Sequence, residues 1–418
     1  MCFSLRLSRR RLTYEIFMRR MARAKVSMGS EKTGRLMRKQ SFCRRKSKKY
    51  TVVVIFAAVV FLAAAAGTAL CALYLSGRAK IENSAGQSIP NVEMLSDRQS
   101  AEDIRERSGL SAVRWQDDWV AIDGKVYSYE SRRINLLVLG VDKAGKMDPE
   151  PDFEKWLSGQ TDAMFVVSID PADKDVSIVG IPRNSMIEVD VYDGEGHVDR
   201  TIFDQICLQY PYAGGAEHGL EKTAEAVSEL LYGLPIHGAF AIGYEAVSKI
   251  NDMAGGVDVV ALESLDTPFG SYEKGESLHL EGEFVLAYVK VRDVNVIGSP
   301  TMRLERQKQY LTALADKMKD EIKKDPMLVA RIYDAVSGYI NTNIGVSEMV
   351  YLAAQAAGYQ FGGENICLLE GEDRAVPIVR DGKETGDFYD DFYLDEDSLK
   401  ETMIRIFYKE VKLEERKE

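Results

Sequence analysis

The sequence predicts an α/β fold in which a mixed central sheet is covered by helices on both faces and is preceded by one transmembrane helix. Two observations carry this prediction. Apolar runs of strand length alternate along residues 133–412 with segments that show helical spacing of apolar residues. A continuous uncharged stretch, residues 51–76, precedes that region. The composition of the 418-residue chain, 45% hydrophobic and 28% charged, excludes collagen, low-complexity disorder and small disulfide-stabilised scaffolds.

The uncharged stretch separates two parts of opposite charge. As a helix, residues 51–76 reach roughly 39 Å at about 1.5 Å per residue, enough to cross a hydrocarbon core of about 30 Å. Residues 1–49 hold 17 Lys and Arg against two acids, whereas the rest of the chain carries a net charge of −26. The positive-inside rule therefore predicts a single-pass protein of the cell membrane, with a cytoplasmic tail over 1–50 and an extracytoplasmic C-terminal part.

Each of these two segments has an alternative interpretation. The uncharged stretch could be a buried core helix, but its basic flank is a poor match to such a helix. The basic tail could bind nucleic acid, but an orientation signal with contact to anionic lipid explains it better. We therefore expect the membrane as a partner and no nucleic acid.

A stalk and transitional segment, residues 77–132, is expected between the membrane and the domain. Residues 77–105 are polar and have little periodicity, which is typical of a stalk. A short strand pair is expected between Trp119 and Tyr129. Residues 133–412 are then expected to form one extracytoplasmic domain, because no clean linker interrupts them.

The domain is expected to begin with three strands. Residues 134–142 form a nearly continuous apolar run, typical of a strand buried on both faces. Residues 162–170 and 175–182, joined by a short turn, predict a hairpin. The later elements are expected as a helix over 216–232, a strand over 237–244, a helix over 245–255, a strand over 257–262, helices over 281–290, 301–323, 327–339 and 347–357, a strand over 365–371 and a helix over 396–410. Ser347 is the expected N-cap of the 347–357 helix.

Two aspartates mark a candidate metal site. Asp142 ends the first buried strand and Asp162 begins the next one. If these strands are antiparallel neighbours, both carboxylates lie at one edge of the sheet, where ligands of α/β sheets bind. Two hard oxygen ligands beside a phosphate suit Mg²⁺. The alternative is that each aspartate is an ordinary turn residue at a strand end.

Basic side chains at the ends of elements predict an anion site. Arg183 follows a strand, and Arg292 ends the segment VLAYVKVR. Arg303, Arg306 and Gln307 share one face of a helix. Guanidinium groups bind phosphate oxygens in bidentate geometry. The alternative is ordinary salt bridging with the abundant Asp and Glu residues.

The remaining motifs in the sequence do not indicate a functional site. Gly140, Gly145 and Lys146 match a phosphate-loop pattern, but a proline-containing stretch follows instead of a helix start. The four histidines show no metal-binding spacing, so zinc is not expected. Cys207 and Cys367 follow the uncharged stretch and could pair, although their spacing does not specify a disulfide.

The content and order of several motifs resemble the LytR-CpsA-Psr family. INLLVLGVD, TDAMFVVSIDP, VSIVGIPRN, LEGEFVLAYVKVRD and MRLERQKQYL follow one another over residues 135–311, with a family-like tail to about residue 410. The short basic tail and single span also fit. The resemblance implies a membrane-anchored phosphotransferase that takes a glycopolymer, such as teichoic acid or capsule, from an undecaprenyl pyrophosphate carrier. It attaches this polymer to a peptidoglycan acceptor through a phosphodiester, with lipid pyrophosphatase activity as a side reaction.

The resemblance also implies roles for individual residues. Asp142 and Asp162 would hold Mg²⁺, Arg183, Arg292 and Arg303 would be catalytic and bind the pyrophosphate, and Lys290, Arg306 and Gln307 would bind substrate. The metal and the arginines would absorb charge during phosphoryl transfer while a sugar hydroxyl attacks. The polyprenyl chain would need a long apolar pocket.

Four positions depart from the family pattern. Gln160 and Lys290 stand where the family has arginine, and Asn184 and Pro300 stand where it has an acid. These changes are expected to weaken anion binding and any base, so that Gln160→Arg with Asn184→Asp would raise the rate. They also support an alternative function, a catalytically weak or inactive extracytoplasmic module that binds polyprenyl pyrophosphate or phosphate lipids. A membrane-linked regulator that acts through the basic tail is a third interpretation.

Overall fold

The computed structural model describes most of the chain after the uncharged stretch. The described residues are Thr68, 71–83, 89–107, 114–153, 159–325, 327–356, 359, 365–380 and 383–413. Contacts divide the chain into two units, residues 1–72 and 73–418, and the fold below is that of the second unit. The basic tail and most of the 51–76 stretch lie outside the described residues. Within the described part of the chain, no helix has both the length and the apolar character needed to span a membrane.

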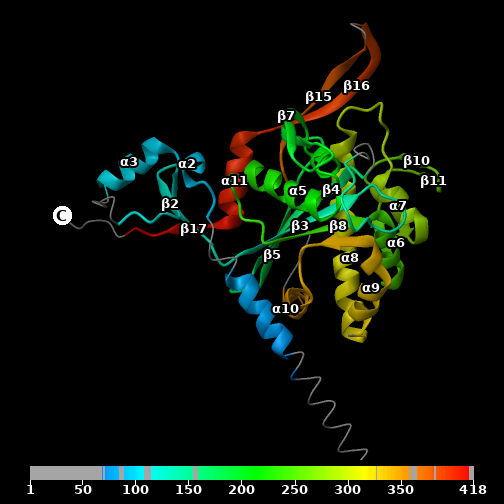
Figure 1. Cartoon of the computed structure of the whole chain (residues 1–418), viewed down its shortest axis with the longest axis horizontal. Helices are drawn as coiled ribbons and strands as arrows, with labels where there is room; N and C mark the ends of the chain where they lie inside the picture. Colours follow the sequence, from blue (N-terminus) through cyan, green and yellow to red (C-terminus); the bar gives the residue numbers. More distant parts are fainter. Residues whose placement is uncertain are drawn as a thin grey trace, which may run out of the picture. The chain divides into compact units, whose positions relative to one another are not determined.

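A six-stranded mixed sheet forms the centre of the unit (Figure 1). In spatial order its strands are β13 (Ile340–Thr342), β8 (Gly238–Gly243), β3 (Ile134–Val141), β4 (Thr161–Asp170), β5 (Asp175–Gly180) and β14 (Ile366–Leu368). The predicted hairpin is confirmed, because β4 pairs antiparallel with β5, and β4 also pairs antiparallel with β3. β3 and β8 are parallel, as are β5 and β14. The continuous apolar run of β3 follows from its central place in the sheet.

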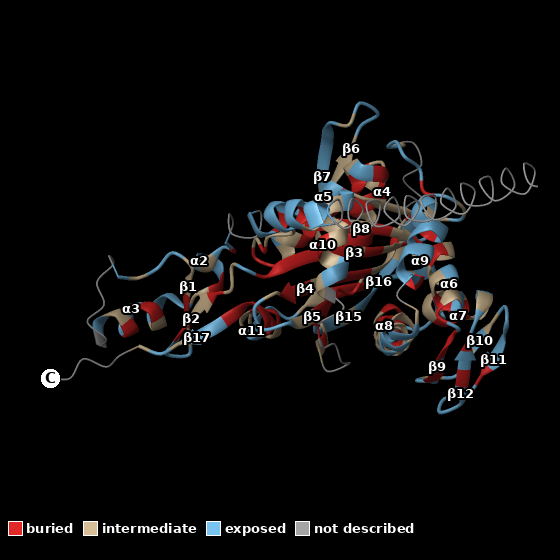
Figure 2. Ribbon diagram, turned by 90° about the horizontal axis from the view of Figure 1, so that it is seen from below, coloured by how far each residue is buried: buried red, intermediate tan, exposed pale blue. Residues whose placement is uncertain are grey.

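Helices cover both faces of this sheet, as the sequence predicts. The helices after the first strand pair are α4 (Gln209–Tyr212), α5 (Ala216–Leu230), α6 (Tyr244–Met253), α7 (Gly282–Lys290), α8 (Ser299–Lys324), α9 (Leu328–Val336), α10 (Val346–Ala356) and α11 (Glu396–Phe407), with short 3-10 turns η1 (Ile206–Leu208) and η2 (Ser337–Tyr339). On one face, Leu139 belongs to a core that includes Leu220 of α5 and Met403 of α11. On the other face, Ile134 shares a core with Tyr351 of α10. Figure 2 shows buried residues concentrated in the central strands between these layers.

A smaller lobe follows α6 and positions α7 and α8. Its strands are β9 (Val257–Val260), β10 (Leu265–Thr267), β11 (Gly270–Tyr272) and β12 (Ser277–Leu280). The strand expected over 257–262 is confirmed as β9, but it pairs with β12 and not with the central sheet. Val259, Leu280 and Tyr288 bury the lobe against both helices.

The segment expected to be a stalk is folded over much of its length. Residues 73–83 are helical, and α2 (Val92–Leu95) and α3 (Arg98–Arg107) follow. The expected strand pair is confirmed as β1 (Trp119–Ile122) and β2 (Lys125–Tyr129), which β17 (Tyr408–Val411) extends. In α3 only Ala101 and Ile104 pack, against Ala121 and Val126. Two apolar residues three apart are too weak a pattern to indicate a helix in the sequence.

Three other features differ from the expectation. The hairpins β6 (Met186–Tyr192) with β7 (Val198–Gln205), and β15 (Gly371–Arg380) with β16 (Lys383–Leu394), carry no clear alternating pattern because most of their residues are not buried. The helix α10 begins at Val346, so Ser347 lies in its first turn and is not the N-cap. Cys207 and Cys367 are free thiols.

Candidate functional site

The two aspartates lie at one edge of the sheet, as the antiparallel arrangement predicts. Gly140 of β3 pairs with Ala163 of β4, but Val141 pairs with Thr161, so that Asp162 is an extra residue in β4. Such a bulge turns a side chain away from the regular alternation. The backbone N–H of Asp142 donates to the Gln160 carbonyl at 2.9 Å, which closes this end of the pair.

Two arginines converge on Asp162. Arg183 Nη1 lies 2.8 Å from Asp162 Oδ1, and Arg303 Nη2 lies 3.2 Å from the same oxygen. Arg183 Nη2 also donates to Gln160 Oε1 at 2.5 Å and to Cys207 Sγ at 2.9 Å. The guanidinium of Arg183, in the turn between β5 and β6, is therefore held by three partners, and Asp162 joins it to Arg303 of α8.

The remaining basic residues flank this pair. Lys290, the last residue of α7, places Nζ 2.6 Å from Asp142 Oδ1 and 4.5 Å from the centre of the Tyr244 ring. Arg292 Nη1 donates to Ser299 Oγ at 2.9 Å. The structure thus brings six of the eight predicted site residues, all except Arg306 and Gln307, around one space.

Two of the arginines that line this space have buried guanidinium nitrogens that make no hydrogen bond among the described residues. The Nε atoms of Arg183 and Arg303 are buried and lack a hydrogen-bond partner in the part of the chain that the structure describes. A buried unmade donor of this kind costs about 1–3 kcal/mol. Burial lowers the pKa of Arg303 to about 10, so its guanidinium remains charged at neutral pH. An anion with several oxygens would satisfy both donors.

The space is a cleft that adjoins an apolar cavity. The cleft has a volume of about 580 Å³, and its charged lining includes the residues above and the exposed Glu283. The cavity, about 140 Å³, lies between the β3–β4 strands and α6, α7 and α8. Five residues line both spaces: Asp142, Asp162, Tyr244, Leu286 and Lys290. The rest of the cavity wall is almost entirely apolar. One ligand with an anionic head and an apolar tail would fill both.

Arg306 does not line the cleft, although the sequence places it with the substrate-binding residues. Its side chain is 1% exposed. It donates to the Tyr288 carbonyl and, at 2.6 Å, to the Val291 carbonyl, and its Nε lies 2.8 Å from Glu263 Oε1. The last carbonyls of a helix lack partners within the helix, and a basic side chain can supply them. Arg306 therefore fixes the end of α7.

Gln307 connects the apolar cavity with Asp162 of the basic cleft. It lines the apolar cavity, and its Nε2 donates to the carbonyls of Asp162 and Val289 at 3.3 and 3.0 Å. It positions the bulged aspartate relative to α7. Sequence reasoning missed Cys207 and Ser299, which hold Arg183 and Arg292, because neither belongs to a recognisable motif.

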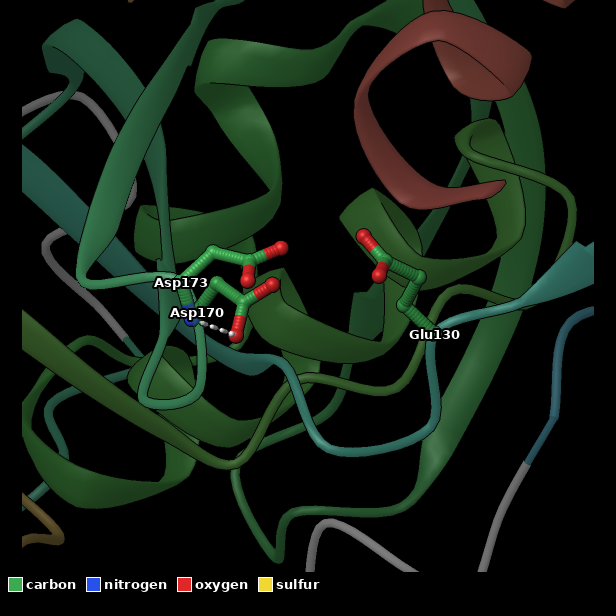
Figure 3. A group of neighbouring side chains, drawn as sticks. All are labelled: Glu130, Asp170 and Asp173. Atoms are coloured by element: carbon green, nitrogen blue, oxygen red, sulfur yellow. Dashed lines mark hydrogen bonds between the residues drawn. The ribbon is translucent and has the colours of Figure 1, made fainter. Parts of the chain in front are cut away.

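A second carboxylate cluster lies at the opposite end of the β3–β4 pair (Figure 3). Glu130, Asp170 and Asp173 are, among the described residues, the one group of three potential ligands close enough to share a metal ion. However, Lys409 Nζ lies 2.5 Å from both Glu130 Oε1 and Asp173 Oδ2, and Arg133 Nε lies 3.1 Å from Glu130 Oε2. These cations already pair with the carboxylates. The cluster is an ion-pair network that joins β17 to the β4–β5 turn.

The fold and the site together define a class: α/β proteins whose central sheet ends at a basic cleft continuous with an apolar cavity. The sequence model of the LytR_cpsA_psr family matches residues 99–376. The chain belongs to this family, as the order of its motifs predicts.

Two relatives with named activities are similar to this chain. TagV of Bacillus subtilis (strain 168), a polyisoprenyl-teichoic acid–peptidoglycan teichoic acid transferase, is 26% identical over 247 residues, 56% of this chain and 56% of TagV. TagU of Bacillus mycoides (strain KBAB4), which bears the same activity name, is 26% identical over 188 residues, 45% of this chain and 53% of TagU. The chain thus spans about half the length of the curated relatives it matches.

Two solved structures are also similar to this chain. The crystal structure of B. subtilis TagV is 23% identical and superposes with a TM-score of 0.46, covering 65% of this chain and 96% of TagV. A structure of TagT bound to LIIa-WTA is 20% identical with a TM-score of 0.44, covering 65% of this chain and 88% of TagT.

Proposed function

We propose that this chain is a membrane-anchored phosphotransferase that moves a glycopolymer from a polyprenyl pyrophosphate carrier to peptidoglycan. The observation that carries the proposal is the wall shared by the arginine cleft and the apolar cavity. A polyprenyl pyrophosphate has the required anionic head and apolar chain, and undecaprenyl pyrophosphate is the expected carrier. The names of the TagV and TagU relatives support teichoic acid or a similar polymer as the cargo.

The arginines would bind the diphosphate. The free Nε donors of Arg183 and Arg303 are directed to no protein acceptor within the described residues, and Arg292 lines the same cleft. Each hydrogen bond to a charged oxygen contributes about 1.5–3 kcal/mol. Asp162 holds two of these arginines at a fixed distance, so the head group would meet them preorganised.

The apolar cavity would receive the start of the isoprenoid chain. Its volume of about 140 Å³ is smaller than the roughly 300–1,000 Å³ of typical ligand pockets. A long chain therefore requires α7 and α8 to move away from the β3–β4 strands. Ala163 and Leu311 face the cavity from opposite walls and would separate in this movement.

The reaction would be a phosphoryl transfer. A sugar hydroxyl of peptidoglycan attacks the phosphorus that carries the glycopolymer, a new P–O bond forms, and the P–O bond to the lipid phosphate breaks. The lipid leaves as a monophosphate, and the hydroxyl proton passes to solvent through the open cleft. The arginines stabilise the charge that develops on the phosphoryl oxygens. Water in place of the sugar hydroxyl gives the pyrophosphatase side reaction.

Magnesium is the proposed cofactor, and the residues present fit it. Mg²⁺ is usually held by one or two carboxylates together with substrate phosphates and water, and Asp142 and Asp162 provide two carboxylates at the cleft. When bound, Mg²⁺ would neutralise charge on the phosphate oxygens. Lys290 pairs with Asp142 in this structure and would compete with the ion.

We also propose that residues 51–76 anchor the protein with its tail in the cytoplasm and its domain outside the membrane. The charge step between the two parts of the chain supports this topology. Protease added to intact protoplasts should remove the domain. Cleavage of the tail alone would show the opposite orientation.

The alternative of a lipid-binding module without turnover has one observation in its favour. Asp142 and Asp162 are both paired with basic side chains, which leaves neither carboxylate free to act as a base. In that case the cleft and cavity would bind the carrier, but the acceptor hydroxyl would not be activated.

An assay with the full-length protein in detergent separates the two functions. A labelled glycan on a prenyl pyrophosphate is incubated with peptidoglycan oligomers, and both covalent transfer and lipid binding are measured. We expect slow transfer in the wild type and none in Arg183→Ala. Tight binding without transfer would support the module, and the absence of both binding and transfer would contradict both functions.

A further inference from the structure

The hairpin β15–β16 extends from the unit (Figure 1), and its buried residues lie only near its base, in β16. Asp390 and Asp391, near this base, are 8% and 5% exposed. Gln205 Nε2 donates to Asp391 Oδ1 at 2.9 Å, which leaves Asp390 as the buried carboxylate directed to the side of α8. The hairpin therefore places acidic groups inside the domain, close to the two elements that carry the arginines.

The first of these elements is the beginning of α8. Asp390 Oδ2 accepts a hydrogen bond from the N–H of Gly298 at 2.9 Å, and the Asp373 carboxylate accepts one from Thr301 Oγ1 at 3.1 Å. Gly298 has φ of 78°, and a Cβ at this position would lie 3.1 Å from Asp373 Oδ2, so the turn requires glycine. No side chain of the turn caps the helix itself. Asp390 satisfies the N–H of the N-cap residue Gly298, Asp373 binds the Thr301 hydroxyl in the first turn, and the positive end of the helix dipole favours both carboxylates.

This turn carries the arginines of one side of the cleft. Ser299, which follows Gly298 directly, accepts the hydrogen bond from Arg292, and Arg303 lies one turn further along α8. Burial and the nearby Arg183 lower the pKa of Arg292, and Asp390 acts in the opposite direction. Any displacement of the turn would move both Arg292 and Arg303.

The second element is the turn between β5 and β6, which carries Arg183. Its neighbour Asn184 is buried, and Nδ2 donates to the Asp390 carbonyl at 2.9 Å and to Asp373 Oδ1 at 3.4 Å. The Asn184 carbonyl accepts from the N–H of Phe392 at 2.9 Å. The same two hairpin aspartates thus contact both elements. An aspartate at position 184 would have no N–H to donate and would add a third carboxylate beside them.

We infer that the hairpin β15–β16 is a positioning element that acts together with Asp162 to set the distance between Arg183 and the two arginines Arg292 and Arg303. Its Asp373 and Asp390 hold the start of α8, and its contacts to Asn184 hold the turn after β5. The consequence for ligand binding rests on the proposed function. A diphosphate spans both groups of arginines, whereas a monophosphate needs only one. The hairpin should therefore determine the preference for a prenyl diphosphate over a prenyl monophosphate.

The test uses the full-length protein in detergent with geranylgeranyl diphosphate and geranylgeranyl monophosphate as probes. Thr301→Val and Asp390→Ala each remove one hydrogen bond to the turn and should reduce the diphosphate preference by about three- to tenfold. Asn184→Asp should reduce it by about tenfold. Asp390→Asn keeps an acceptor for Gly298 and should restore the preference to within about twofold of the wild type. A general loss of stability would weaken both probes alike.

Asp387→Asn is the matched control. Asp387 lies on the exposed part of the same hairpin, away from α8, so this variant removes the same charge without touching the turn. It should leave the preference unchanged. If Thr301→Val, Asp390→Ala and Asn184→Asp also leave it unchanged while the wild type prefers the diphosphate, the inference is wrong.

Amide hydrogen exchange separates this inference from the proposed function. If the wild type does not bind the diphosphate, the proposed function fails, but the hairpin can still be tested without ligand. Asp390→Ala should speed exchange both at residues 298–303 and at residues 184–185, and Asp387→Asn at neither. Faster exchange at only one of the two segments would show that the hairpin does not link them.

Discussion

The two ends of the β3–β4 pair carry charged clusters that differ in charge balance and in closure. At one end, Glu130, Asp170 and Asp173 face Arg133 and Lys409, so that acids outnumber bases. At the other end, four basic side chains face Asp142, Asp162 and the exposed Glu283. The first cluster is filled by its own ion pairs. The second leaves buried guanidinium donors without acceptors among the described residues and opens into a cleft.

This difference distinguishes a structural cluster from a candidate binding site. The first cluster brings three carboxylates close enough to share a metal ion, yet Arg133 and Lys409 already pair with them. The second cluster has as many carboxylates, but it has more basic side chains, it includes buried guanidinium nitrogens without a hydrogen-bond partner among the described residues, and its residues line a cleft that an anion can enter. Unmet buried donors therefore indicate function here better than the number of carboxylates does. The four predictions that follow test this distinction.

The largest effect is expected at the closed end. Arg133→Met should lower the free energy of unfolding by about 3 kcal/mol, because it leaves Asp170 buried without its cation and Glu130 with Lys409 as its one remaining cation among the described residues. Affinity for a prenyl diphosphate should not change in the folded protein. Denaturant unfolding and calorimetric titration measure the two quantities. A marked loss of affinity in this variant would remove the distinction between the two ends.

Arg303→Met should produce the opposite pattern at the open end. Loss of the guanidinium should weaken prenyl diphosphate binding by roughly a hundredfold, since two charge-assisted contacts are lost. The free energy of unfolding should fall by less than in Arg133→Met, because Asp162 keeps Arg183 as a partner. The same two measurements apply. Unchanged affinity would show that the cleft is not the diphosphate site.

A pH dependence should arise at the closed end through His237. Its Nδ1 accepts from the N–H of Asn135 at the start of β3 at 2.9 Å, and burial lowers its pKa to about 4. Between the unfolded value of about 6.5 and this value, the unfolded state binds more protons, so stability rises with pH and falls on acidification. From pH 7 to pH 5 this group should contribute a loss of about 2 kcal/mol.

Replacement of the histidine isolates this contribution. His237→Gln should have a shallower loss of unfolding free energy between pH 7 and pH 5 than the wild type. His197→Gln, in the exposed β6–β7 turn, is the matched control and should follow the wild type. Identical slopes in all three proteins would exclude His237 as the source.

The smallest effect is expected for the metal. Lys290 and Asp142 are each about two-fifths exposed, and exposed ion pairs contribute about 0–1 kcal/mol. Lys290→Met should therefore raise Mg²⁺ affinity by about threefold in the presence of a prenyl diphosphate, whereas Asp142→Asn should lower it. Mg²⁺ titration measures both. If neither substitution alters Mg²⁺ affinity, Asp142 is not a metal ligand.

The sequence predicts the central strands of the sheet and the two aspartates at their edge. The apolar runs of β3, β4 and β5 are long and continuous because they are buried on both faces, and the two aspartates follow from their ends. The order of the motifs also predicts the family, which the match over residues 99–376 confirms. The roles of the individual site residues remain predictions that the experiments above address.

The separate roles of Arg303 and Arg306 and the place of the β15–β16 hairpin could not be predicted, because they depend on tertiary packing. Arg303 and Arg306 share a helix face, but only packing decides that one lines the cleft and the other binds the end of α7. The hairpin β15–β16 is mostly exposed and has no periodic pattern, so its aspartates gave no signal. Their place beside α8 and Asn184 depends on hydrogen bonds between residues that are 72 to 189 positions apart in the sequence.

These contacts also reverse one expectation from the sequence. Gln160 accepts a hydrogen bond from Arg183, and Asn184 donates to the hairpin. An arginine at 160 would repel Arg183, and an aspartate at 184 would repel Asp373. The Gln160→Arg and Asn184→Asp double variant should therefore lower the transfer rate and diphosphate affinity.

The central claim is that the cleft and the cavity bind one amphiphilic ligand. Calorimetric titration of the full-length protein with inorganic pyrophosphate, geranylgeraniol and prenyl diphosphates of increasing chain length tests it most directly. The account predicts that a prenyl diphosphate binds more tightly than either half alone, that affinity rises with chain length, and that Arg303→Met removes the head-group contribution but retains the chain-length dependence. Affinity for diphosphates that is independent of chain length would contradict it.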